Sequence, residues 1–173
     1  SKHKYYTMKK AYLILLITVL FSCKPSEKQL QSEQQIVNSV MDSWHQAATA
    51  ANFENYFNLM TDDAVFIGTD ATENWNKTAF QAYAKPHFDK GKTWSFRTIE
   101  RNIFFSTNGK TAWLDELLDT QMKICRGSGV LAKVNGKWKI KHYVLSMTIP
   151  NEVSKEVIKI KAPIEDALLN TFE

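Results

Sequence analysis

The spacing of hydrophobic positions changes along this chain and divides it into segments. An unbroken apolar run fills residues 11–21. Helical spacing follows at residues 36–51, at 53–60 and at 80–88. Alternating or continuous apolar stretches rich in β-branched and aromatic residues then occupy 93–106, 110–120, 122–134 and 137–148. Helices followed by a long run of strands indicate an α+β fold.

Local signals predict where these elements begin and end. The first helix is expected to begin at Ser32, because Ser32 and Gln35 match a capping box. Asn76 can cap a third helix, which Pro86 is expected to kink and Gly91 to end. Between the second and third helices, residues 64–68 read as a strand.

Two Asn-Gly dipeptides connect the later strands. Asn108-Gly109 and Asn135-Gly136 both accept the positive φ that a type I′ turn requires. We therefore expect two tight hairpins within one antiparallel meander.

The first 22 residues have the pattern of an export signal. Met8-Lys9-Lys10 precedes the apolar run, and that run is too short to span a bilayer comfortably. Leu20-Phe21-Ser22-Cys23 resembles a bacterial lipobox. We expect cleavage before Cys23, lipidation of that cysteine and anchoring in the cell envelope, with the outer membrane favoured over the inner. The alternative is an uncleaved signal anchor with an ordinary thiol at Cys23.

The mature chain of about 150 residues is expected to contain one compact domain. Residues 24–31 are polar and contain a proline, so they are interpreted as a tether to the membrane. The domain covers residues 32–150. The tail, residues 151–173, is partly apolar and contains Pro163, which is expected to interrupt it. It is expected to pack on the domain or on a partner.

Charge and cysteine content exclude several classes of function. Four of the 22 Lys and Arg residues precede Cys23 and no acid does, which leaves 18 basic residues facing 18 acidic ones. This balance gives no reason to expect nucleic acid as a partner. With Cys23 lipidated, Cys125 has no intrachain disulfide partner. No Cys/His group has zinc-site spacing, and neither a metal nor a cofactor is expected.

Three segments together carry a family resemblance: residues 56–68, residues 108–113, and residues 135–142 with Ser146. Through these segments, residues 36–152 resemble the SnoaL-like branch of the nuclear-transport-factor-2-like superfamily. The resemblance implies a cystatin-like cone, in which a curved antiparallel sheet wraps around a long N-terminal helix, with two further helices and a ligand-sized cavity at the open end. It also implies frequent homodimers. It does not imply one function, because this fold hosts many chemistries.

Strand alternation predicts which side chains line the cavity, because alternate residues face opposite sides of a sheet. The more apolar set of each strand is expected to face inward. The inward residues are predicted to include Leu114, Glu116, Arg126, Ser128, Trp138, His142 and Ser146.

Glu116, Arg126 and His142 are the candidate chemical groups. A buried Glu116 should pair with Arg126 or with a ligand, and His142 could exchange a proton near neutral pH. A satisfied salt bridge with a core histidine is the structural alternative, and it is favoured over catalysis. His45 beside the first helical stripe is interpreted as half-buried.

Asp70, Glu73 and Trp75 lie between the first strand and the third helix, where the mouth of the cavity is expected. A role in loop structure and helix entry is favoured for them over contact with a ligand at the rim.

Two hypotheses for function remain. The first is a membrane-anchored binding or accessory domain for a small apolar or amphipathic molecule. The second is a cofactor-independent isomerase, dehydratase or hydrolase that uses the Glu, Arg and His set.

Replacing Cys23 with Ala should release the protein from the membrane, because the lipid on this cysteine provides the anchor. Fractionation of cells into membrane and soluble material measures the release. Cys125→Ser is the control and should stay with the membrane. A Cys23→Ala protein that remains membrane-bound would contradict the lipoprotein interpretation.

Overall fold

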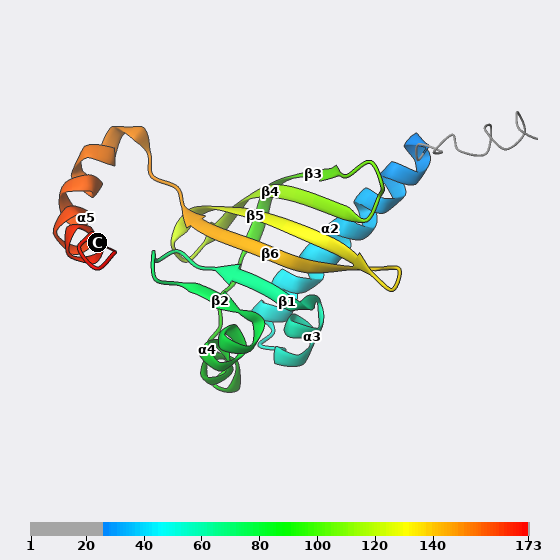
Figure 1. The fold of residues 1–173 in the computed structure, drawn as a ribbon, viewed down its shortest axis with the longest axis horizontal. Helices are drawn as coiled ribbons and strands as arrows, with labels where there is room; N and C mark the ends of the chain where they lie inside the picture. The colour runs from blue at the N-terminus through cyan, green and yellow to red at the C-terminus, as the bar shows by residue number, and fades with distance from the viewer. Residues whose placement is uncertain (1–25, 173) are drawn as a thin grey trace, which may run out of the picture. The chain divides into compact units, whose positions relative to one another are not determined.

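The computed structural model describes residues 26–172 (Figure 1). The predicted signal sequence, Cys23 and the start of the tether lie outside the described residues. The chain divides into two compact units, residues 1–33 and 34–173. The described part of the first unit, residues 26–33, consists of Ser26 and the first turns of helix α2.

Helix α2 spans Glu27–Thr49 and begins earlier than predicted. Ser26 and Gln29 form a capping box, in which the Ser26 amide donates to Gln29 Oε1 at 3.0 Å and the Gln29 amide donates to Ser26 Oγ at 3.3 Å. The same Ser-x-x-Gln pattern occurs at Ser32, and the earlier copy is the one used. Residues 27–31 of the predicted tether are therefore helical.

Two shorter helices follow. Helix α3 spans Phe53–Asn58, and helix α4 spans Lys77–Asp89. Asn76 caps α4 as predicted, because its side chain accepts a hydrogen bond from the Ala79 amide at 2.9 Å. The helix continues through Pro86 to Asp89, and Gly91 follows with a φ of 62°.

Six strands form one sheet in the order β2-β1-β6-β5-β4-β3 (Figure 1). The strands are β1 Met60–Ile67, β2 Asn74–Asn76, β3 Arg97–Phe105, β4 Thr111–Thr120, β5 Lys123–Val134 and β6 Lys137–Met147. Strands β3 to β6 form the predicted antiparallel meander. The sheet as a whole is mixed, however, because β1 pairs with β6 in parallel. Strand β2 was not predicted.

The two predicted turns differ in geometry. Asn135 and Gly136 have φ of 50° and 78°, as a type I′ turn requires. At the other hairpin Gly109 has a φ of 64°, but Asn108 is not in the left-handed region. There the loop is wider and is closed by a hydrogen bond from the Ser106 amide to the Thr111 carbonyl, 2.9 Å long. The type I′ prediction is thus confirmed at 135–136 and wrong at 108–109.

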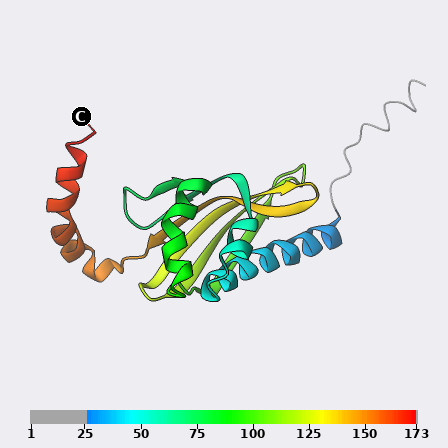
Figure 2. The same ribbon diagram turned by 90° about the horizontal axis from the view of Figure 1, so that it is seen from below.

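The core of the domain lies between the helices and the sheet. Val37, Met41 and Trp44 of α2 are buried with residues of α3, α4 and five strands. Figure 2 shows the part of α2 that belongs to the second unit, residues 34–49, running along the sheet, with α3 and α4 near its C-terminal end. This arrangement is the α+β fold predicted from the sequence.

Strand alternation identified the inward face of β4 but failed on β5 and in part on β6. On β5 the buried positions are Cys125, Gly127, Gly129 and Leu131, so Arg126 and Ser128 face the other side. The prediction assigned the more apolar set of residues to the inner face, and it did not count glycine as apolar. Here Gly127 and Gly129 occupy the inner face. On β6 the register shifts at Lys141, because Val130 pairs with His142 and Leu131 pairs with Ile140. This β-bulge reverses the alternation. Before it Trp138 is buried as predicted, together with Ile140; after it Tyr143 and Leu145 are buried in place of the predicted His142 and Ser146.

The tail is helical. A 3₁₀ turn at Asn151–Val153 leads into helix α5, Ser154–Leu169, which continues through Pro163. The predicted interruption at Pro163 is therefore wrong. None of the side chains of α5 is buried, and Ile160 and Ile164 are 75% and 74% exposed. Packing of this tail on the domain or on a partner stays a prediction. Within residues 26–172, none of the helices has the length and apolar character needed to cross a bilayer.

Candidate functional site

The described core contains a carboxylate, Glu116, that is 1% exposed. It lies on the apolar face of β4, and three donors reach it. His45 Nε2 and the Tyr143 hydroxyl lie 2.8 Å and 2.6 Å from Oε1. Arg101 Nε donates to Oε2 at 2.8 Å. The inward position of Glu116 is confirmed, but its partners are not those expected from the sequence.

Arg101 replaces Arg126 as the cation beside Glu116. The Cα atoms of Arg101 and Glu116 are directly paired across β3 and β4, and the Arg101 side chain is 4% exposed. Its Nη1 donates to Asp42 Oδ1 at 2.8 Å and to Asn38 Oδ1 at 3.1 Å, and its Nη2 donates to Thr98 Oγ1 at 3.1 Å. The guanidinium thereby connects the sheet to α2.

The pKa values of this cluster favour its charged form. Burial raises the pKa of Glu116, but the hydrogen bond from His45, the charge of Arg101 and the hydrogen bond from Tyr143 outweigh it and bring the pKa below the ordinary carboxyl value. Burial lowers the pKa of Arg101, yet Glu116 and Asp42 raise it above its usual value overall. Burial raises the pKa of the Tyr143 hydroxyl well above normal, and the adjacent Glu116 adds to this. Tyr143 is therefore a neutral donor to an anionic Glu116.

Glycine on β5 makes room for this cluster. A Cβ at Gly127 would lie 2.0 Å from the Tyr143 hydroxyl and 3.0 Å from Glu116 Cγ. A Cβ at Gly129 would lie 3.1 Å from the Tyr143 ring. The inner face of β5 therefore carries no side chains where the Tyr143 ring packs against it.

His45 connects the buried cluster to the surface. An ionised carboxylate only accepts hydrogen bonds, so Nε2 carries a proton toward Glu116. In the neutral ring, Nδ1 is then the nitrogen with a lone pair. The ring lines a groove of about 360 Å³. The other lining residues of this histidine groove are Asp42, Gln46, Thr49, Phe96, Arg97 and Thr98. Glu116 is enclosed by its three donors and does not line the groove, whereas His45 does. His45 is therefore the partner of Glu116 that can contact a molecule in the groove.

A second hollow, the aromatic cavity, lies between α4, β1 and the β4–β5 hairpin and has a volume of about 180 Å³. Six aromatic side chains line it: Phe66, Trp75, Phe80, Tyr83, Trp94 and Phe96. Its polar lining groups include Thr69, Glu73 and Gln121. Phe96 also lines the histidine groove, so the two hollows share this lining residue.

Internal contacts hold the walls of the aromatic cavity. The Phe66 and Phe80 rings stack at 4.1 Å, and Trp75 stacks on Tyr83 at 4.6 Å. Trp94 donates a hydrogen bond to the hydroxyl of Tyr56, whose pKa is raised well above normal by burial despite that bond. Most of the aromatic wall is therefore preformed.

The loop between β1 and β2 forms one rim of this cavity. The Gly68 amide donates to the Glu73 carbonyl at 2.9 Å, and the Asp70 amide donates to Glu73 Oε2 at 3.2 Å. Hydrogen bonds from the Thr72 hydroxyl and amide hold the pKa of Asp70 below its ordinary value. Asp70 therefore shapes the loop, while Glu73 and Trp75 line the cavity.

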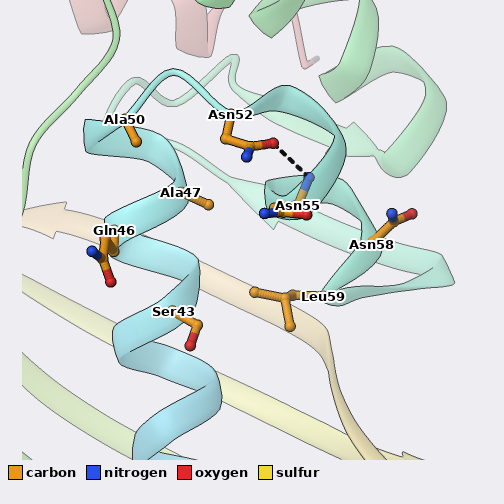
Figure 3. Close-up of a pocket in the computed structure, with 8 residues that line it drawn as sticks. All are labelled: Ser43, Gln46, Ala47, Ala50, Asn52, Asn55, Asn58 and Leu59. Carbon is orange, nitrogen blue, oxygen red and sulfur yellow. Dashed lines mark hydrogen bonds between the residues drawn. The ribbon is translucent and has the colours of Figure 1, made fainter.

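A third hollow has a different character. It is a groove of about 510 Å³ between α2 and α3, and the amide side chains of Gln46, Asn52, Asn55 and Asn58 border it. Figure 3 shows these side chains. These four side chains are exposed. Asn52 Oδ1 accepts from the Asn55 amide at 3.1 Å and so caps α3. The groove is open to water and lacks a buried polar group, so it is a weaker candidate than the two hollows that meet at Phe96.

Several residues of the predicted site do not lie together in the structure. Leu114 and Trp138 are buried, whereas Arg126, Ser128 and Ser146 are exposed, and none of these five lines the aromatic cavity. His142 is half-buried on the opposite face from Glu116. His45, interpreted from the sequence as half-buried, is 5% exposed and holds the position assigned to His142.

Weak signals for the missed residues were present in the sequence. His45 lies four residues after Met41, on the same helical stripe, and Arg101 is the basic residue that the β3–β4 register brings opposite Glu116. No local signal marks Tyr143, because its inward position depends on the bulge at Lys141. Within residues 26–172, no three His, Cys, Asp or Glu side chains are grouped closely enough to hold a metal ion.

Replacing Glu116 with Gln should destabilise the domain by about 3 to 5 kcal/mol, because the buried Arg101 would lose its buried counter-charge and keep only the exposed Asp42. Chemical denaturation near neutral pH measures the free energy of unfolding. Asp119→Asn is the matched control, because Asp119 lies on the same strand as Glu116 but forms an exposed ion pair, with Arg97 of β3. Its loss should lower the free energy of unfolding by about 1 kcal/mol or less. A Glu116→Gln protein no less stable than Asp119→Asn would contradict the buried ion pair.

The same charge makes stability depend on pH. The pKa of Glu116 is lower in the folded state than in the unfolded chain. The ionised carboxylate therefore contributes fully to the free energy of unfolding above the unfolded pKa, and this contribution is lost as pH falls through the folded pKa. We expect acid below about pH 4 to destabilise the parent protein more than the Glu116→Gln variant. Equal acid sensitivity of the two would contradict this assignment.

Comparison with known proteins places the fold. A family model described as a SnoaL-like domain matches residues 37–150. An NTF2-like protein of unknown function from Pseudomonas putida shares 15% identity at a TM-score of 0.60, with 71% of this chain and 92% of that chain covered. A proposed dehydratase of the NTF2-like family from Streptomyces avermitilis shares 11% identity at a TM-score of 0.60, with 69% and 99% covered.

A protein of unknown function with a cystatin-like fold from Nostoc punctiforme shares 11% identity at a TM-score of 0.56, with 72% of this chain and 95% of that chain covered. No protein with a curated description matches the sequence. At these identities the solved structures establish the fold alone. Because the family model covers more than half of the chain, the protein belongs to the SnoaL-like domain family.

Proposed function

We propose that this protein is a binding domain that captures a small apolar or amphipathic molecule in the aromatic cavity. The observation that carries the proposal is the lining of that cavity, in which six aromatic side chains surround about 180 Å³ with few polar groups. Ligand sites are typically apolar, concave and largely preformed, with a small number of polar groups that orient the ligand. The volume equals that of about six water molecules in the liquid, so the ligand is small.

The location of the domain is part of the proposal. Lipid on Cys23 would hold the domain at the surface of an envelope membrane, so the ligand would be met outside the cytoplasm. The basic, apolar and small residues before Cys23 support this location.

Phenol, a small aromatic probe, should bind in the cavity and shift the indole N–H resonances of Trp75 and Trp94. Trp75→Ala should weaken binding about two- to tenfold, because an aromatic contact is lost. Two-dimensional nuclear magnetic resonance of the isotope-labelled protein measures both effects, with the Trp94 resonance followed in the variant.

The matched control is Trp113→Ala, which removes a tryptophan that stacks on Phe104 and is 46% exposed. It should leave phenol binding unchanged. If phenol shifts neither the Trp75 nor the Trp94 resonance, the cavity is not a binding site for such molecules and the proposal fails.

A second candidate function is a cofactor-independent proton-transfer enzyme, and the histidine groove favours it. His45 is oriented by an anionic Glu116 and borders a groove that also contains Arg97. In this function Nδ1 of His45 would take a proton from a carbon acid, and Arg97 would stabilise the developing oxyanion. Glu116 would be a positioning residue. The dehydratase proposed among the relatives is consistent with such chemistry.

Elimination of water from 4-hydroxybutan-2-one tests this second function, since the base removes the proton beside the carbonyl and hydroxide leaves from the next carbon. His45→Gln should lower kcat by about 10² to 10⁴-fold. His142→Gln, which changes the half-buried histidine of β6, should not. Absence of turnover above the buffer rate, or equal rates in the two variants, would remove the candidate.

A further inference from the structure

We propose that the ligand of the aromatic cavity is a small organic cation that carries an alkylated ammonium group. This inference rests on the proposed binding function and names its ligand class. It is carried by two features of the cavity wall, the aromatic faces and the sign of the charged side chain.

Several rings of the aromatic wall lie nearly parallel to one another. Trp75 and Phe80 have ring planes 14° apart with centroids separated by 5.7 Å, and Phe80 and Trp94 are 19° apart at 6.0 Å. The face of each ring carries partial negative charge, which attracts a cation within about 6 Å of the centroid. Tryptophan is the strongest of these partners, and the cavity has two.

The charged lining is acidic. Glu73 lines the cavity and is half-buried. Among the described lining residues none is basic. His87 contacts the Tyr83 ring at 5.4 Å between centroids but is not part of the lining. An anionic ligand would lose its hydration without gaining a counter-charge, whereas an organic cation would gain one.

Local structure holds the Glu73 carboxylate in place. Its Oε2 accepts from the Asp70 amide, and the absence of a side chain at Gly68 is required, because a Cβ there would lie 2.1 Å from that oxygen. The carboxylate therefore has a defined position beside the aromatic wall. This preorganisation reduces the entropic cost of binding.

The same lining argues against an inorganic cation. Calcium takes six to eight oxygen ligands, and magnesium needs near-ideal octahedral geometry. The cavity provides one carboxylate, and half of its lining residues are aromatic. A weakly hydrated cation with an apolar surface fits this lining better.

Titration with choline and with its neutral isostere 3,3-dimethylbutan-1-ol tests the proposal. The two molecules have the same heavy-atom skeleton and differ in the positive charge. We expect choline to bind the intact domain at least about tenfold more tightly, as followed by the Trp75 and Trp94 indole resonances.

Two variants separate the contributions of the rings and the carboxylate. Trp75→Leu keeps apolar volume but removes a π face, so it should weaken choline more than the alcohol. Glu73→Gln keeps an acceptor for the Asp70 amide and should weaken choline about three- to fivefold without changing alcohol binding. Glu152→Gln, in the exposed 3₁₀ turn, is the matched control and should change neither.

Each outcome decides the proposal. Equal binding of the two probes, or tighter binding of the alcohol, would overturn the cation assignment and leave the proposed apolar binding site intact. Binding of phenol without binding of choline would do the same. If phenol, choline and the alcohol all fail to bind, both this inference and the proposed function are wrong.

Discussion

The buried charge of Glu116 is the constraint on which the rest of the core depends. A carboxylate on the apolar face of a strand is stable when its lost hydration is replaced by charge and hydrogen bonds. Here the replacement comes from three other elements: His45 on α2, Arg101 on β3 and Tyr143 on β6. Arg101 continues the network to Asp42 on α2. The placement of the helix on the sheet is therefore tied to one carboxylate.

In this arrangement the buried carboxylate of Glu116 is separate from the side chains that could contact a ligand, namely His45 and those that line the aromatic cavity. Glu116 is enclosed by three donors and orients His45, whose ring borders a groove. Beyond Phe96 lies the aromatic cavity, where a second carboxylate, Glu73, is half-buried at the rim. The fold is shared by relatives of diverse or unknown function, so chemistry must be argued from such local features.

The reach of sequence reasoning can be seen strand by strand. Periodicity placed β4 to β6 within a residue or two of their observed ends, and Asn135-Gly136 adopts the predicted turn, because both properties are local. Alternation placed Glu116 inward on β4. It failed on β5, where glycines form the inner face, and beyond the bulge at Lys141 on β6. A single bulge exchanges the two faces of a strand, and apolar content alone does not reveal it.

The sequence by itself determined the α+β class, most element boundaries and the presence of a carboxylate in the core, since these follow from the spacing of apolar residues and the conformational preferences of short segments. Tertiary structure decided the partners of that carboxylate. Arg101 meets Glu116 through strand register, Tyr143 through a bulge, and His45 through the packing of α2 on the sheet. Each of these contacts joins positions 15 to 71 residues apart, so no local pattern could select among the candidate partners.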